Sequence, residues 1–268
     1  MTVAALQFHW SFFWQLLVHP PSPFVQGAIR TVYLAVISQA LGVVLGLILA
    51  LWRRSGNVVL RAFASGYIWI IRGTPLLVQA VLIYDGLAAL GVYSFSDITV
   101  LGVSIPGVVQ AGILTLTLNE GAYMAEIMRA AIDSVDKGQT EAAESLGMRR
   151  RQAMRHVVLP QAMRVVIPPL GNEFNNMLKV TSLLSVIGLQ ELFLAGQDYN
   201  STTFRTFEIF LVVAIYYIMM TTVWAVIQSV IERRLEARGG EIIDRVSLRQ
   251  RLFGGGMVGA ADQLRGAR

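Results

Sequence analysis

The sequence predicts an all-α membrane protein with five transmembrane helices. Composition is the first observation behind this prediction, because 54% of the 268 residues are hydrophobic and only 15% are charged. A soluble domain of this length carries more charge. The second observation is that residues 32–51 and 209–231 form charge-free runs. A helix of about 20 residues spans the roughly 30 Å hydrocarbon core of a bilayer.

The distribution of basic residues predicts the orientation. Arg53, Arg54 and Arg61 follow the first charge-free run, whereas the connection 85–104 has no lysine or arginine. Basic residues return between 129 and 179 and again after 231. Because cytoplasmic loops are enriched in lysine and arginine, we expect the N-terminus outside and the C-terminus in the cytoplasm. This topology explains most of the net charge of +5, so nucleic acid is not an expected partner.

The first 23 residues are expected to lie at the outer membrane interface rather than to cross the membrane. They lack the basic start and small-residue cleavage site of a signal peptide. Aromatic residues followed by prolines are typical of an interfacial segment. These residues are Phe8, Trp10, Phe12, Phe13, Trp14, Pro20, Pro21 and Pro23.

A transmembrane domain is predicted over residues 24–235, with spans at about 28–52, 64–90, 101–131, 180–197 and 208–232. The second span contains Arg72-Gly73-Thr74-Pro75. Because Pro75 cannot donate to the helix ladder, we expect two helical pieces there, with Thr74 capping the second. Residues 133–179 are predicted to be a cytoplasmic region, and 236–268, rich in glycine, a flexible cytoplasmic tail.

Four polar residues fall at predicted membrane depth: Arg72, Asn119, Glu120 and Glu191. A helix that faces only lipid has no reason to carry such side chains, so they indicate protein contacts or a solute pathway. Catalytic and metal sites are not predicted. The chain has no cysteine and three widely separated histidines, and it lacks a phosphate-binding Gly-x-x-x-x-Gly-Lys-Ser/Thr loop. We therefore expect no cofactor and no ATP hydrolysis by this chain.

Residues 139–160 form a charged segment between apolar stretches. Thr140 is expected to cap a helix with Glu141 in its first turn, and Gly147 to end it in the left-handed conformation. A second helix at about 149–158 is expected before Leu159-Pro160. The segment could be a compact projection that docks on a partner, or only a basic loop that holds orientation against anionic lipid.

The 139–160 segment resembles the Glu-Ala-Ala signature of ABC importer permeases. Residues that match it are Glu141, Ala142, Ala143, Gly147, Val157, Leu159 and Pro160, with Val157 in place of the usual isoleucine. Flanking sequences at 72–79, 121–127, 159–162, 168–170 and 179–183 extend the likeness to the polar amino acid permeases over nearly all of residues 24–235.

This resemblance implies the type I importer permease (MetI-like) fold in the inner membrane of a bacterium. It also implies that Glu141, Ala142, Ala143, Gly147, Leu159 and Pro160 belong to a coupling region that docks on a separate ATPase dimer. A second permease protomer, identical or paralogous, and an extracytoplasmic solute-binding protein are the other implied protein partners. The implied cargo is a polar amino acid or a related small solute.

Candidate substrate residues follow from the charges of an amino acid. Glu120, with Asn119 beside it, could meet the ammonium group, and Arg72 or a helix N-terminus near Thr181-Ser182 could meet the carboxylate. Glu120 could instead fasten two helices together, and Arg72 could extend its side chain to the membrane surface. A self-sufficient channel or secondary carrier for amino acids, using Glu120 and Arg72, is the alternative function. No set of residues supports a membrane enzyme.

Overall fold

The computed structural model describes residues 8–100 and 102–239, most of them helical. The first half contains α1 (Trp10–Val18), α2 (Ser22–Arg53), α3 (Val58–Arg72), α4 (Leu76–Val81), the π-helical turn η1 (Leu82–Gly86), α5 (Leu87–Ala89), and strands β1 (Ile98–Val100) and β2 (Val103–Ile105). The second half contains α6 (Gly107–Asp133), α7 (Lys137–Ser145), α8 (Arg150–Ala153), η2 (Met154–Val158, π-helical), α9 (Leu159–Val180), η3 (Thr181–Ile187, 3-10 helical), α10 (Leu192–Thr203) and α11 (Thr206–Gly239). Predicted tail residues 240–268 and the first seven residues lie outside the described part.

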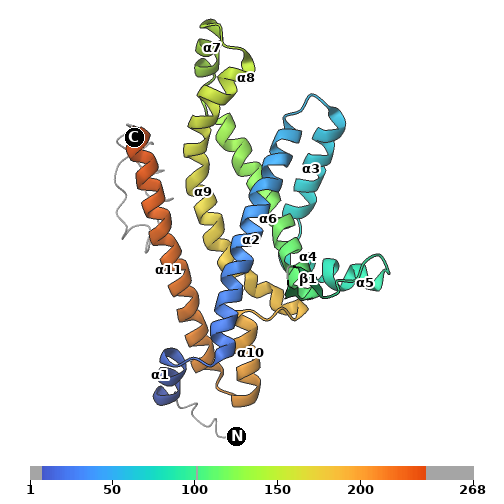
Figure 1. The fold of residues 1–268 in the computed structure, drawn as a ribbon, viewed down its shortest axis with the longest axis vertical. Helices are drawn as coiled ribbons and strands as arrows, with labels where there is room; N and C mark the ends of the chain where they lie inside the picture. The colour runs from blue at the N-terminus through green and yellow to red at the C-terminus, as the bar shows by residue number, and fades with distance from the viewer. Residues whose placement is uncertain (1–7, 101, 240–268) are drawn as a thin grey trace, which may run out of the picture.

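Helices α2 and α6 form the centre of the molecule (Figure 1). Their backbones approach closely because α2 carries glycine where α6 crosses it. A Cβ atom on Gly46 would lie 2.4 Å from the Met124 Cβ, and one on Gly42 would lie 2.6 Å from the Glu120 Cγ. Small residues spaced four apart let helices pack at short range in a membrane.

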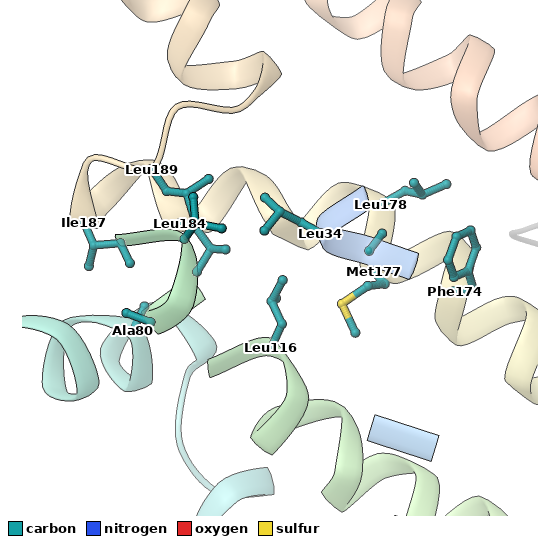
Figure 2. Packing of buried hydrophobic residues seen from close by; sticks show 12 residues of the cluster. Leu34, Ala80, Leu116, Phe174, Met177, Leu178, Leu184, Ile187 and Leu189 are labelled. Carbon is teal, nitrogen blue, oxygen red and sulfur yellow. The ribbon is translucent and has the colours of Figure 1, made fainter. Parts of the chain in front are cut away.

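The main apolar core joins α2 and α6 to α9 and η3. Figure 2 shows Leu34 of α2, Leu116 of α6, Met177 of α9 and Leu184 of η3 in this cluster. Leu34 and Leu184 are fully buried. Three stretches that are distant in sequence, α2, α6 and the continuous α9–η3 segment, therefore meet in one core, which positions the polar residues around it.

Two of the described helices, α2 and α11, are long and apolar enough to cross a membrane. Two bent pairs raise this number to four if each is one span: α3 with α4–α5, bent by 107°, and residues 150–187 with α10, bent by 51°. Helix α6 has 27 residues, about 40 Å at 1.5 Å per residue. Its composition is too polar to stand out as a span, because much of its surface contacts protein rather than lipid.

The break in the predicted second span is present, but its capping differs. Helix α3 ends at Arg72 and α4 begins at Leu76. The Thr74 hydroxyl donates to the Ile70 carbonyl at 2.9 Å, so it closes the end of α3. The prediction that Thr74 caps α4 is wrong, because Pro75 occupies the N-cap position and makes no side-chain cap bond.

Two predicted helix boundaries are wrong. The third helix does not begin near residue 101, because the antiparallel hairpin β1–β2 precedes α6. The fourth does not begin at residue 180, because α9 starts at Leu159 and α10 ends only at Thr203. Helix α9 carries polar residues on one side and buries Val166, Phe174 and Leu178 on another. The composition averaged over residues 159–179 is a mixture of polar and apolar residues, so the amphipathic helix α9 was not recognised as one continuous helix.

Candidate functional site

Helices α7 and α8 project from one end of the molecule, opposite α1 and α10 (Figure 1). Helix α7 begins at Lys137, and its N-cap Asp136 accepts a hydrogen bond from the Gly138 N–H at 2.7 Å. The prediction that Thr140 caps this helix is wrong, because Asp136 supplies a carboxylate one turn earlier. Ala143 is buried, whereas Glu141 and Ala142 are exposed. The projection thus exposes both a charge and a small side chain at its surface.

Gly147 ends α7 as predicted. Its φ is +84°, in the left-handed region that favours glycine. The Met148 N–H donates to the Ala143 carbonyl at 3.1 Å, and the Gly147 N–H donates to the Glu144 carbonyl at 2.9 Å. These bonds satisfy carbonyls at the helix end, in the manner of a Schellman motif. The turn leaves Leu146 83% exposed at the tip.

The chain returns from the tip as one continuous helical segment. Helix α8 begins at Arg150, passes through η2, and runs directly into α9. Leu159 and Pro160 therefore stand in the first turn of α9 rather than after a separate helix. Proline costs little in a first turn, because its missing N–H has no partner there. Both are exposed. No loop separates α8 from α9.

An ionic network joins α2 to α6 just before α7. Glu126 pairs with Arg53 and, at 2.9 Å, with Arg129. Asp133 pairs with Arg129 at 3.0 Å and with Arg54 at 2.5 Å. Arg30 of α2 takes part in a different contact, in which it donates to the Gln190 carbonyl at 3.1 Å.

Glu120 and Asn119 are adjacent on α6 but contact different helices. Glu120 is buried, and its carboxylate accepts a hydrogen bond from the Gln39 amide of α2 at 2.9 Å. Asn119 donates to the Gln79 side chain of α4 at 3.1 Å. Gln79 in turn donates to the Thr74 hydroxyl at 2.9 Å. Asn119 therefore supports the break between α3 and α4, while Glu120 fastens α6 to α2.

Arg72 and Glu173 bring opposite charges close to this pair. The Arg72 guanidinium is exposed and lies 5.2 Å from the centroid of the Tyr123 ring. Glu173 of α9, half-buried, lies within electrostatic reach of both Arg72 and Glu120. Sequence analysis missed Glu173, because residues 133–179 were assigned to the cytoplasmic region. Recognising the amphipathic period of α9 would have placed this carboxylate on a helix that packs against α2 and α6.

Thr181 and Ser182 were predicted to belong to this group of polar residues, but their hydroxyls bond elsewhere. They follow the C-terminal end of α9, and their hydroxyls donate to the carbonyls of Leu178 at 3.0 Å and Lys179 at 2.7 Å. The expected helix N-terminus at these residues is wrong, because the helix begins at Leu159. Thr181 is also fully buried. Neither residue offers a free anion-binding site here.

No group of three or more histidine, aspartate or glutamate side chains within residues 8–100 and 102–239 could hold a metal ion. The polar groups that do meet are one guanidinium, two carboxylates and three amides, from α2, α3, α4, α6 and α9. Such a set can bind or guide a zwitterion.

Residues 42–237 match the family described as "Binding-protein-dependent transport system inner membrane component". The chain is 39% identical over 222 residues to a probable amino-acid permease protein, YxeN, of Bacillus subtilis, covering 83% of this chain and 95% of the relative. It is 37% identical over 232 residues to the glutamine transport system permease protein GlnP of Escherichia coli K12, covering 86% and 99%.

Solved structures agree with these relatives. A crystal structure of an amino acid ABC transporter with histidines has a TM-score of 0.72 and 42% identity, covering 79% of this chain and 94% of that chain. An inward-facing structure of the MetNI methionine ABC transporter has a TM-score of 0.61 at 19% identity, covering 85% and 99%. The second likeness supports the fold alone.

Proposed function

Because the chain belongs to the family of binding-protein-dependent transport system inner membrane components, as the permease component of an amino acid ABC importer, we propose that its 139–160 segment couples it to a separate ATPase. The observation that carries this proposal is the α7–α8 projection. Its signature residues Glu141 and Ala142 are exposed at one end of the molecule. Because α8 continues into α9 without a loop, a displacement of the projection would be transmitted directly to α9.

The proposed topology has five crossings, made by α2, the bent α3–α5 unit, α6, the α9–α10 unit and α11. The N-terminus then lies outside and the projection lies in the cytoplasm, where ATP is available. Two permease protomers, identical or paralogous, would form the pathway, with an external solute-binding protein delivering the substrate. Family membership counts against the alternative of a self-sufficient channel or carrier.

We place the substrate pathway beside Arg72 and Glu173, with Asn119 and Glu120 behind them. Arg72 is exposed and Glu173 half-buried, so both remain reachable by a solute. Their opposite charges suit the carboxylate and ammonium groups of an amino acid. Glu120, being buried against Gln39, is better placed to hold α6 than to meet a solute directly.

Replacing Gly147 with valine is expected to reduce substrate-stimulated ATPase activity at least about fivefold. A β-branched residue in the left-handed region costs about 1–3 kcal/mol, which distorts the end of α7 where the ATPase docks. The measurement is ATP hydrolysis and uptake in liposomes that hold the permease, its ATPase and its binding protein. Gly56→Val is the matched control, because Gly56 is exposed, has open space around its Cβ position and has no positive φ.

Indifference of both activities to Gly147→Val would show that the segment only sets orientation. Loss of activity in the Gly56→Val control as well would mean that general disturbance of this end of the molecule, not the geometry of α7, explains the effect.

Changing Glu173 to glutamine is expected to alter which amino acids are imported. Removing this charge should reduce uptake of a cationic amino acid about tenfold more than uptake of a neutral polar one, since a lost pairing between charged groups costs about 1.5–3 kcal/mol. The measurement is competitive uptake with each ligand saturating its binding protein. Glu120→Gln is the comparison, and we expect it to change thermal stability without changing this preference. Equal losses for both amino acids with Glu173→Gln would remove Glu173 from the pathway.

A further inference from the structure

Helix α1 has three distinct faces. Successive residues turn by about 100°, so residues four apart lie on the same side. Phe13 and Leu16 form a buried face. Trp10, Trp14 and Val18 form an apolar face that is 63%, 54% and 63% exposed. Beside it, the exposed residues Ser11 and Gln15 form a polar strip.

The buried face fixes how α1 is turned. Phe13 and Leu16 pack into an apolar cluster with Ile209 and Val212 of α11. The His9 N–H donates to the Glu208 carboxylate at 2.9 Å at one end of α1. The Tyr216 hydroxyl donates to the Leu17 carbonyl at 3.2 Å near the other end. Because both ends are held to a candidate membrane span, the two exposed faces point in fixed directions.

An exposed apolar surface that suits contact with lipid begins just after α1 in the chain. Helix α2 begins at Ser22, four residues after α1 ends, and exposes Val25 and Ile29 in its first turns. Helix α2 is itself a candidate span, so its exposed apolar side faces hydrocarbon. Tryptophan is enriched at the boundary between hydrocarbon and water, because its ring is apolar and its N–H needs a polar partner.

We propose that α1 is an interfacial helix that lies in the membrane–water boundary at the end of the molecule opposite α7 (Figure 1). Trp10, Trp14 and Val18 contact lipid, Ser11 and Gln15 face water, and Phe13 and Leu16 hold the helix against α11. The helix thereby fixes the depth at which the start of α11 sits. This inference goes beyond the proposed coupling and transport roles, and neither its success nor its failure depends on them.

Nitroxide scanning tests the three faces separately. The chain contains no cysteine, so a single introduced cysteine provides one labelling site in the permease. Trp14→Cys and Val18→Cys probe the apolar face, and Ser11→Cys and Gln15→Cys are the matched controls on the adjacent polar strip. The complex with a cysteine-free ATPase is placed in lipid nanodiscs. Collision rates are then measured with oxygen, which concentrates in lipid, and with a water-soluble nickel chelate.

We expect oxygen to dominate at positions 14 and 18 and nickel to dominate at 11 and 15, with the ratio changing at least about threefold between the two faces. Nickel dominating at all four positions would overturn the proposal, because α1 would then stand in water. Protection of positions 14 and 18 from both reagents would also overturn it, since protein would cover that face.

Discussion

Replacing Glu191 with leucine is expected to lower the stability of the permease by about 3–5 kcal/mol, because it leaves buried hydrogen-bond donors unsatisfied and removes a helix cap. Glu191 is fully buried at the start of α10. One carboxylate oxygen accepts from the Leu194 N–H at 2.8 Å, and the other accepts from the Tyr217 hydroxyl at 2.7 Å. Leucine would leave both donors without these acceptors, each costing about 1–3 kcal/mol, and would remove the cap of α10.

The measurement is the temperature at which the purified complex loses its folded, monodisperse form. A loss of this size should lower that temperature by about 10 °C. Gln190→Leu is the matched control, because Gln190 is the exposed neighbour, and its side-chain amide donates to Asp198 at the surface. Tyr217→Phe should give an intermediate loss, since it removes one donor and leaves the α10 cap in place. Equal melting of the Glu191 and Gln190 variants would contradict this account.

Glu191 also shows what sequence reasoning can recover about a membrane protein. Its position at membrane depth indicated a protein contact or a pathway, and the structure places it in a contact that joins α10 to α11. The identity of its partners could not be predicted, because Tyr217 is 26 residues away and Thr31 is 160 residues away. Burial in a low-dielectric environment makes the need for a partner predictable, whereas chain topology decides which partner supplies it.

Local chemistry was predicted better than helix extent. The break at Thr74-Pro75 and the end of α7 at Gly147 depend on proline geometry and on the left-handed conformation, which act within a few residues. The start of α9 depends on contacts with α6 and α11. Polar residues such as Asn172 and Glu173 made this part of the sequence look like a cytoplasmic connection, so the start of the helix was not predicted. The signature residues Glu141, Ala142 and Ala143 lie on a projection, but the bounds of its helices needed the structure.

The sequence Gly42-Val43-Val44-Leu45-Gly46 also indicates a close contact between two helices. Two glycines four residues apart in an apolar helix are typical of a close helix–helix contact. The structure shows that this contact is made within the chain, between α2 and α6. The carboxylate of Glu120 lies at the same contact, bonded to Gln39. Close packing and the buried polar pair therefore depend on the same two glycines.

Replacing Gly46 with valine is accordingly expected to prevent α2 and α6 from packing. The first added carbon would stand 2.4 Å from the Met124 Cβ and 2.9 Å from the Ala125 backbone nitrogen. Backbone atoms cannot move aside as a flexible side chain can, so the helices must separate. Overpacking of a core costs about 1–3 kcal/mol for small insertions. Separation here would add the loss of contacts along the whole α2–α6 interface.

Gly66 of α3 provides the matched control, because nothing lies within 4 Å of its Cβ position. The measurement is the yield of folded permease in membranes and its melting temperature. Alanine substitutions at the two sites should change the stability of the permease in different directions. Gly66→Ala should be neutral or stabilise α3 by up to about 1 kcal/mol through helix propensity, whereas Gly46→Ala should already destabilise. Comparable yields from Gly46→Val and Gly66→Val would mean that α2 and α6 can separate without loss, and that Gln39 and Glu120 need not be in contact for the fold to form.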